Sequence, residues 1–342
     1  MIEKYLVKSV LARKRWRIFK KNKSAVISVF ILFFLVVGTA LSPLIANSKP
    51  LYLNYKGQSY FPAFVEYTVD DFGINDSLVV DYRNMELDAN AGDKALWPPV
   101  QWDPFESNSK VDSYPSAPSS INLMGTDDRG RDVFTRLLYG FQYSFGFAVS
   151  VWFFSLLLGT ALGGTMGYFG GRTDFIGQRI VEILSTMPLF FLLIILVSIF
   201  TPSLALLIGI SCMFAWIGIS YYVRAEFLKN RNREFVEAAR SLGASHTRII
   251  FKHILPNSLT PIITFAPFTI AAEIVGLASL DYLGLGLQAP TPSWGELLSQ
   301  AHKYYSIAWW LAFYPSLALF IVLNLLNLIG QGVRDAMDPN MT

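Results

Sequence analysis

The run SAVISVFILFFLVVGTALSPLI, residues 24–45, carries no charged side chain and is almost entirely apolar. A helix needs about 20 such residues to cross the hydrocarbon core of a bilayer. The 23 residues before the run contain nine lysines and arginines and one acidic residue, Glu3. This pattern predicts a first transmembrane helix over residues 24–46, with residues 1–23 as a basic cytoplasmic N-terminus. The alternative is a signal peptide cleaved near Ala46, but the apolar segment of a signal peptide spans only about 7–15 residues.

Five further apolar blocks follow, near residues 141–169, 180–200, 203–222, 258–280 and 307–330. Over the whole chain, 53% of residues are apolar and 15% are charged, whereas a soluble domain carries about 25% charged residues. These values exclude an ordinary soluble enzyme and a disordered chain. The sequence predicts an all-α polytopic membrane protein with six transmembrane helices, five of them in a core over residues 137–330. One cysteine and three histidines at no ligand spacing give no basis for a disulfide within the chain or for a metal site.

Residues 47–136 differ in character, because they contain no long apolar run and carry fourteen acidic against eight basic side chains. Aromatic residues and prolines occur together in Tyr60-Phe61-Pro62 and Trp97-Pro98-Pro99, which favours a packed subdomain over a disordered linker. If the chain alternates sides from a cytoplasmic N-terminus, this segment is a periplasmic insert. The basic loop over residues 223–257 and the tail over residues 331–342 are then cytoplasmic, as the positive-inside rule requires.

The basic loop has the pattern of two short helices joined by a turn. Gly243 stands where the first helix is expected to end, and Ser245 where the second is expected to be capped. The second helix is expected to stop before Pro256. One face of the first helix holds Phe235, Ala238, Ala239 and Leu242, and an apolar face of the second holds Ile249, Ile250, His253 and Ile254. Small side chains on an exposed face allow another protein to approach closely; the alternative is a loop that only connects two helices.

Two acidic residues accompany the apolar block near residues 258–280. Glu273 lies within it, where an ionisable side chain is costly and seldom faces lipid, and Asp281 lies near its end. Each is a candidate for a polar patch on a translocation pathway. The alternative for Glu273 is pairing with a neighbouring helix or subunit. For Asp281, the nearby Gly284 and Gly286 favour the alternative of an aspartate that braces a turn.

Three motifs carry a resemblance to a known family. Glu237-Ala238-Ala239, Gly243 and then Ile254-Leu255-Pro256 resemble the EAA loop of permease subunits of ATP-binding-cassette (ABC) importers. Gly125-Thr126-Asp127-Asp128-Arg129-Gly130-Arg131-Asp132 resembles the GTDxxGRD signature of the dipeptide, oligopeptide and nickel permeases of the C type. Gly284-Leu285-Gly286-Leu287, followed by Pro292-Ser293-Trp294-Gly295-Glu296, resembles an external loop of the same group.

From the residues alone, Gly125 and Gly130 are expected to permit a tight turn, and Asp127 or Asp128 to cap the following helix. Together with Asp132 they form the expected external signature turn. This turn either shapes the entry to the second transmembrane helix or contacts peptide. The insert and the segment Ser279-Leu280-Asp281-Tyr282 are most similar to permeases of Yej-type peptide importers.

The resemblance implies the ABC type I importer permease fold and a transport subunit without enzymatic activity, in the inner membrane of a bacterium with both termini in the cytoplasm. Glu237, Ala238, Ala239 and Gly243 would couple it to a separate ATPase, which alone binds ATP and magnesium. The implied partners are a second homologous permease (YejB-like), one or two ATPase subunits (YejF-like), an external peptide-binding protein (YejA-like) and membrane lipid, but no nucleic acid.

The residues themselves agree with a separate ATPase, since the sequence has no G-x-x-x-x-G-K-[ST] motif. Two other functions stay open at this stage. A secondary transporter or channel would need a relay of buried charges, of which Glu273 is the main candidate. A membrane scaffold or sensor would use the insert as a ligand-binding ectodomain.

Overall fold

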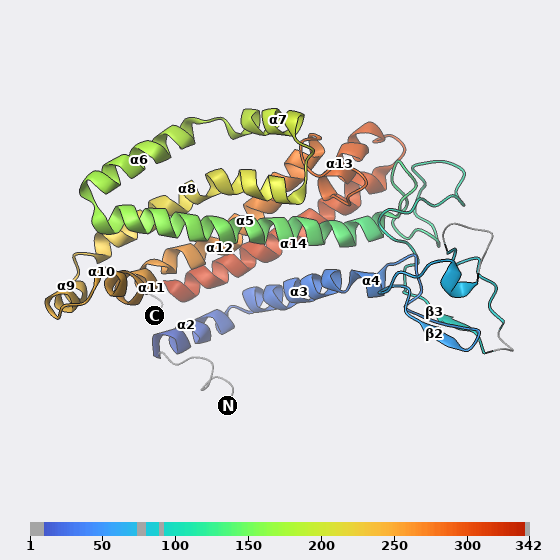
Figure 1. Cartoon of the computed structure of the whole chain (residues 1–342), viewed down its shortest axis with the longest axis horizontal. Coiled ribbons are helices and arrows are strands. Elements are labelled where there is room, and N and C mark those ends of the chain that lie inside the picture. Colours follow the sequence, from blue (N-terminus) through green and yellow to red (C-terminus); the bar gives the residue numbers. More distant parts are fainter. Residues whose placement is uncertain (1–9, 74–79, 89–91, 339–342) are drawn as a thin grey trace. The chain divides into compact units, whose positions relative to one another are not determined.

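The computed structural model describes residues 10–73, 80–88 and 92–338 of the chain, and Figure 1 shows its course. The first nine residues of the predicted cytoplasmic N-terminus, two short stretches of the insert that include Asp76, and the last four residues of the tail lie outside the described residues. The chain forms two compact units. Residues 1–33, 144–288 and 318–342 make the helical unit, and residues 34–143 and 289–317 make the insert unit.

The helical unit consists of long apolar helices and the short helices of the basic loop. Three long helices contribute residues to both units: α3 (Lys23–Ala40), α5 (Val133–Phe169) and α14 (Trp309–Met337). The other helices of this unit are α2 (Val10–Lys21), α6 (Gly171–Thr186), α7 (Leu189–Ile199), α8 (Leu204–Asn230), α9 (Glu234–Ser241), α10 (His246–Arg248), η3 (Ile249–Ile254), α11 (Leu255–Ser258) and α12 (Thr260–Tyr282).

The predicted all-α membrane fold is confirmed. Among the described residues, five helices are long and apolar enough to cross a membrane, and the pair α6 and α7 supplies a sixth span if its two bent halves are counted together. The two halves meet at an angle of 71°, and Figure 1 shows the break between them in green. Pro188 lies at this break. Its ring and missing N–H are incompatible with a continuous helix, which explains the interruption. The apolar block near residues 180–200 is therefore interrupted and does not form one continuous helix.

Two predicted boundaries differ from the structure. The first long helix, α3, ends at Ala40 instead of running to residue 46, and α4 (Ser42–Ile45) follows it with Pro43 in its first turn. Helix α5 begins at Val133, so it crosses the predicted end of the insert at residue 136. The polar residues 172–174, which lie between two of the apolar blocks, are in the first turn of α6.

Helices α5 and α8 approach each other closely through glycines spaced four residues apart. A Cβ atom on Gly163 would lie 2.5 Å from the carbonyl oxygen of Ser220, and one on Gly159 would lie 2.8 Å from that of Trp216. Gly167 repeats the contact one turn further on, 2.6 Å from the carbonyl oxygen of Arg224. Small residues at this spacing let helices pack backbone to backbone, which is a main source of helix association in membranes.

The insert unit holds a small antiparallel sheet of strand order β2-β1-β3, built from β1 (Tyr52–Tyr55), β2 (Gln58–Tyr60) and β3 (Lys94–Leu96). The 3-10 helix η1 (Asp70–Phe72) and the helix α13 (Trp294–Lys303) also belong to this unit. Phe72 lies at the centre of its aromatic core, with its ring centroid 4.6 Å from that of Tyr60. Burial raises the pKa of the neighbouring Tyr82 to about 12. The prediction of a packed subdomain is confirmed.

Candidate functional site: the coupling loop, the signature turn and the membrane carboxylates

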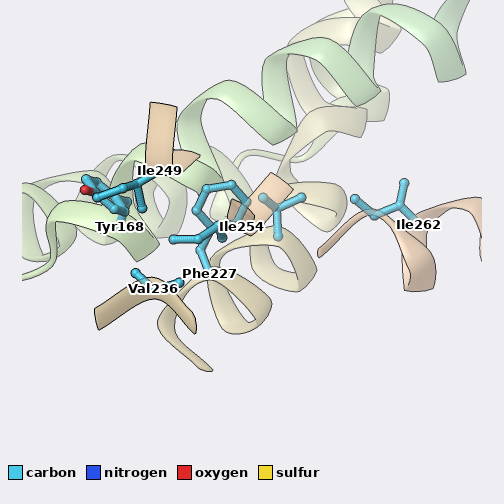
Figure 2. Packing of buried hydrophobic residues seen from close by; sticks show 7 residues of the cluster. Tyr168, Phe227, Val236, Ile249, Ile254 and Ile262 are labelled. Carbon is cyan, nitrogen blue, oxygen red and sulfur yellow. The ribbon is translucent and has the colours of Figure 1, made fainter. Parts of the chain in front are cut away.

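The basic loop folds into a compact knob, defined here as α9, α10, η3 and α11. Val236 of α9 is completely buried, and it belongs to an apolar cluster with Phe227 of α8 and with Ile249 and Ile254 of η3. Figure 2 shows these side chains with Tyr168 of α5. The hydroxyl of Tyr168 lies 2.7 Å from His246 Nδ1, which fixes the second half of the knob to α5. The knob is thus a packed element rather than a loose connection.

One face of α9 is left uncovered by this packing. Phe235 is 40% exposed and Leu242 is 88% exposed, and Ala238 lies exposed between them in the sequence. Glu237 is also exposed, whereas Ala239 is half-buried and packs against the apolar cluster. The predicted coupling residues therefore divide. Ala239 supports the knob from within, while Glu237, Ala238 and Gly243 are available to a partner.

The turn after α9 is formed as the sequence predicts. Gly243 has a φ of +77°, a conformation that favours glycine. The N–H of Ala244 donates to the carbonyl of Ala239 at 3.0 Å, and the N–H of Gly243 donates to that of Arg240 at 3.0 Å, as in a glycine-terminated helix end. Ser245 then caps the next helix, since its hydroxyl accepts from the N–H of Arg248 at 3.4 Å.

The second helix of the knob differs from its prediction. It does not stop before Pro256, because η3 is a single π-helical stretch that leads directly into α11. At their junction the N–H of Leu255 donates to the carbonyl of Ile250, five residues earlier. Pro256 then occupies the first turn of α11, where its missing N–H is tolerated.

The signature turn, residues 125–132, contains two glycines with positive φ, Gly125 at +77° and Gly130 at +79°. The predicted tight turn is confirmed. Both positions are also crowded, because a Cβ on Gly125 would lie 2.7 Å from the Trp310 indole nitrogen, and one on Gly130 would overlap the ring of Tyr114. The Trp310 indole in turn donates to the carbonyl of Thr126 at 3.0 Å.

The helix cap lies at a different aspartate from the two predicted. Asp132, directly before α5, accepts from the N–H of Thr135 at 2.8 Å, so it is the capping residue in place of Asp127 or Asp128. Asn122 donates to the other Asp132 oxygen at 2.9 Å. Burial raises the pKa of the Asp132 carboxyl despite these bonds. Burial, followed by the charge of Asp127, raises that of Asp128 as well.

Asp127 instead anchors a buried network of charges. Its carboxylate lies 2.6 Å from Arg131 and 3.3 Å from Arg136. Glu296 of α13 pairs with the same two arginines, at 3.1 Å from Arg131. Asp127, Arg131 and Arg136 are buried and Glu296 is 17% exposed, so removal of any one charge would leave a largely buried charge uncompensated.

This network joins the signature turn to the third sequence motif. Trp294 of that motif donates its indole N–H to the carbonyl of Leu137 at 2.9 Å, and its ring stacks on Phe141 with centroids 5.6 Å apart. Helix α13 is not predicted from the sequence, where residues 292–296 resemble part of an external loop. The signal was present, because Ser293 and Glu296 have capping-box spacing and the Ser293 hydroxyl accepts from the N–H of Glu296 at 3.3 Å.

The two carboxylates of α12, Glu273 and Asp281, have different surroundings. Asp281 is buried at the end of α12, and its Oδ1 accepts from the N–H of Leu287 at 2.6 Å across the turn that contains Gly284. This geometry supports the turn-bracing role of Asp281. Glu273 is half-buried two turns earlier in α12 and lines a pocket with residues of α5 and α8. The structure therefore does not bring the two candidate pathway residues together.

Comparisons with known proteins agree with this architecture. The family model described as "Binding-protein-dependent transport system inner membrane component" matches residues 159–342, which is more than half of the chain. The chain belongs to this family of transport permeases. A second model, the "N-terminal TM domain of oligopeptide transport permease C", matches residues 11–63.

Several characterised permeases of the family resemble the chain over most of its length. It is 36% identical to the peptidoglycan transport system permease protein YejE of Agrobacterium fabrum, over 98% of this chain and 94% of the relative. It is 39% identical to the inner membrane ABC transporter permease protein YejE of Escherichia coli, over 97% of this chain and 98% of the relative. The dipeptide transport system permease protein DppC of Alkalihalophilus pseudofirmus is 40% identical over 69% of this chain and 79% of the relative.

Among solved structures, a chain of the MetNI methionine ABC transporter in an inward-facing conformation matches with a TM-score of 0.50 and 20% identity. The match covers 59% of this chain and 97% of that chain, and it supports the ABC importer permease fold. The chain is therefore a multi-pass membrane permease subunit of an ABC importer, a class that works with an ATPase and a substrate-binding protein.

Proposed function

We propose that this chain is the permease subunit of an ABC importer that carries peptides across the inner membrane of a bacterium. The named substrates of its relatives, peptidoglycan for one YejE and dipeptides for DppC, support peptides or peptide-bearing cell-wall fragments as the cargo. In this proposal the chain has no ATPase site of its own. ATP and magnesium bind to a partner ATPase, and a second homologous permease and an external binding protein complete the importer.

The observation that carries the proposal is the exposed face of α9 on a packed knob. Phe235, Ala238 and Leu242 offer an apolar surface with a small residue between two large ones. The cluster around Val236 packs this surface against α5 and α8. A displacement of the knob would therefore be transmitted to these two long apolar helices. An ATPase that binds this surface differently in its open and closed states would shift the permease between inward- and outward-facing forms.

The same proposal assigns sides to the other parts of the chain. Both termini and the knob lie in the cytoplasm, and the insert lies in the periplasm. The insert contacts the binding protein or covers the outer mouth of the pathway, and its acidic balance favours a basic partner surface. The signature turn shapes the entry to α5, since its residues are occupied in the buried ion network. Glu273 is assigned to the pathway, and Asp281 to the turn.

The test is uptake by the purified assembly. The tagged chain is purified with the subunits that accompany it, reconstituted into vesicles, and supplied with a binding protein and radiolabelled tri-alanine or a muramyl peptide. Uptake that requires ATP hydrolysis is expected. Uptake that follows an ion gradient without ATP would instead support a secondary transporter. Ligand binding to the insert without any uptake would support a scaffold or sensor.

A further inference from the structure

Helices α5, α8 and α12 enclose a pocket of about 150 Å³ within the helical unit, which is space for several water molecules. Its lining is mainly aromatic and aliphatic, with Trp152 from α5, Tyr222 from α8 and Phe265 from α12. The rings of Tyr222 and Phe265 lie 5.6 Å apart. Ser155 and Thr269, which carry hydroxyls, also line the pocket.

Glu273 is the one charged side chain among the described residues that line this pocket. It stands on the same face of α12 as Thr269 and Phe265, at successive steps of four residues. Among the described residues, no hydrogen bond or ion pair to its carboxylate is found. A carboxylate in an apolar span without a partner is costly, so such residues commonly face a pathway or bind a cation.

The chemistry of the pocket selects among cations. A divalent metal needs several oxygen ligands, and no group of three or more acidic, histidine or cysteine side chains suited to a metal occurs in the described part of the chain. An organic ammonium needs less: one carboxylate, a hydroxyl acceptor and aromatic faces within about 6 Å. The lining residues include one carboxylate, from Glu273, two hydroxyl-bearing residues, Ser155 and Thr269, and three aromatic residues.

We propose that this pocket is a subsite for a primary ammonium group of the transported peptide, with Glu273 as its counter-ion and the aromatic rings as its walls. The inference rests on the proposed function for the identity of the ligand, but the ammonium chemistry rests on the pocket alone. Two sources of the group are possible in a peptide, the N-terminal amine and a lysine side chain.

Carbodiimide labelling of the full chain, in the complex in which it is purified from membranes, tests the site without any need for transport. The loss of unmodified Glu273 is followed by mass spectrometry, with N-acylurea and amide products counted together because a primary amine also captures the activated carboxyl. Exposed Glu182, which pairs with Arg179 at 2.5 Å, serves as the internal control. We expect n-butylammonium at roughly ten times its dissociation constant to slow labelling of Glu273 about tenfold. The uncharged n-butanol should have no effect, and neither compound should slow the loss of unmodified Glu182.

Peptides then identify the source of the ammonium group. Protection by tri-alanine but not by N-acetyl-tri-alanine assigns the N-terminal amine, and protection by N-acetyl-Ala-Lys-Ala assigns the lysine side chain. Absence of labelling at Glu273, or labelling that n-butylammonium leaves unchanged, would overturn the site. Uptake of tri-alanine without any protection would overturn the site and leave the peptide importer standing. Protection by n-butylammonium in an assembly that imports no peptide would support the ammonium site and overturn the peptide importer.

Discussion

Gly243 forms the turn after α9, so its backbone conformation determines how the knob is presented to the proposed ATPase. Its φ is +77°, and no heavy atom lies within 4 Å of the place a Cβ would occupy. Any effect of a larger residue must therefore come from the backbone, with strain of roughly 1–3 kcal/mol for an unsuited residue. We expect Gly243→Val to insert at normal level but to lose ATPase co-purification and peptide uptake.

Asparagine provides the matched control, because it adopts positive φ far more readily than a β-branched residue. Gly243→Asn should retain most co-purification and uptake. Normal coupling in the valine variant, measured at equal membrane level, would show that the turn after α9 does not aim the knob.

Asp132 and Asp81 have opposite pKa shifts and therefore predict opposite pH dependences. Burial raises the pKa of Asp132, so its charge destabilises the folded unit above that pKa, and the penalty disappears as the pH falls. The side-chain hydrogen bond from Asn84 lowers the pKa of Asp81, so its contribution is favourable at neutral pH and is lost on acidification.

Thermal melts of Asp132→Asn and Asp81→Asn should show this difference. Asparagine retains a capping oxygen for Thr135. The Tm of Asp132→Asn minus that of wild type should therefore be most favourable at neutral pH and should decrease toward about pH 4.5. Asp81→Asn should have its least favourable difference at neutral pH. Parallel pH trends in the two variants would contradict the assigned surroundings of the two carboxyls.

Residues with local causes were predictable from sequence, and residues with long-range partners were not. Gly243 and Ser245 follow from helix-ending and capping patterns within a few positions. The pairing of Glu296 with Arg131 and Arg136 joins positions about 160 apart in the chain. Nothing in one sequence indicates which of many charges will be buried together. For the same reason the sequence predicts Asp127 or Asp128 as the helix cap, whereas Asp132 forms it.

At the scale of elements, Gly159, Gly163 and Gly167 of α5 determine how closely α8 can approach. A Cβ on Gly163 would lie 2.5 Å from a backbone oxygen of α8, so Gly163→Ala must push the helices apart. Overpacking of this kind costs about 1–3 kcal/mol, and we expect a lower Tm of the purified complex and a lower membrane level.

Gly209→Ala is the control for this prediction. Gly209 lies in α8 with no heavy atom within 4 Å of a Cβ, and alanine favours a helix over glycine by about 1 kcal/mol. Its Tm should be unchanged or slightly raised. Equal Tm values for the two variants would mean that α5 and α8 do not pack through these glycines.

Apolar length predicted the long helices well, because each needs enough residues to cross a bilayer. It was less informative where a helix is interrupted. The angle of 71° between α6 and α7 and the π-helical stretch η3 both depend on how neighbouring segments pack, which periodicity does not record. Apolar length also misses α13, which has only ten residues, although the capping-box spacing of Ser293 and Glu296 indicates its start.

At the scale of the whole molecule, the charge distribution predicts one topology. The insert is acidic and the segment around the knob is basic, so the positive-inside rule places them on opposite sides. A reporter enzyme that is active only outside the cytoplasm should be active when fused after Asp88 and silent after Arg233. Activity of the Arg233 fusion would be incompatible with a cytoplasmic knob.

In the proposed function a separate ATPase drives transport by docking on the exposed face of α9. Ala238→Glu tests it most directly, because a charge in a close apolar contact is strongly unfavourable, while the exposed side chain has no role in the packing of the knob. Thr173→Glu, an equally exposed change in the first turn of α6, is the matched control.

The measurement is ATP-dependent uptake of radiolabelled tri-alanine by vesicles containing equal amounts of wild type or variant, together with the amount of ATPase that co-purifies. We expect Ala238→Glu to lose both co-purified ATPase and uptake, while Thr173→Glu retains both. Full uptake by Ala238→Glu at a normal protein level would contradict docking at this face, since the knob would then be only a connection between two helices.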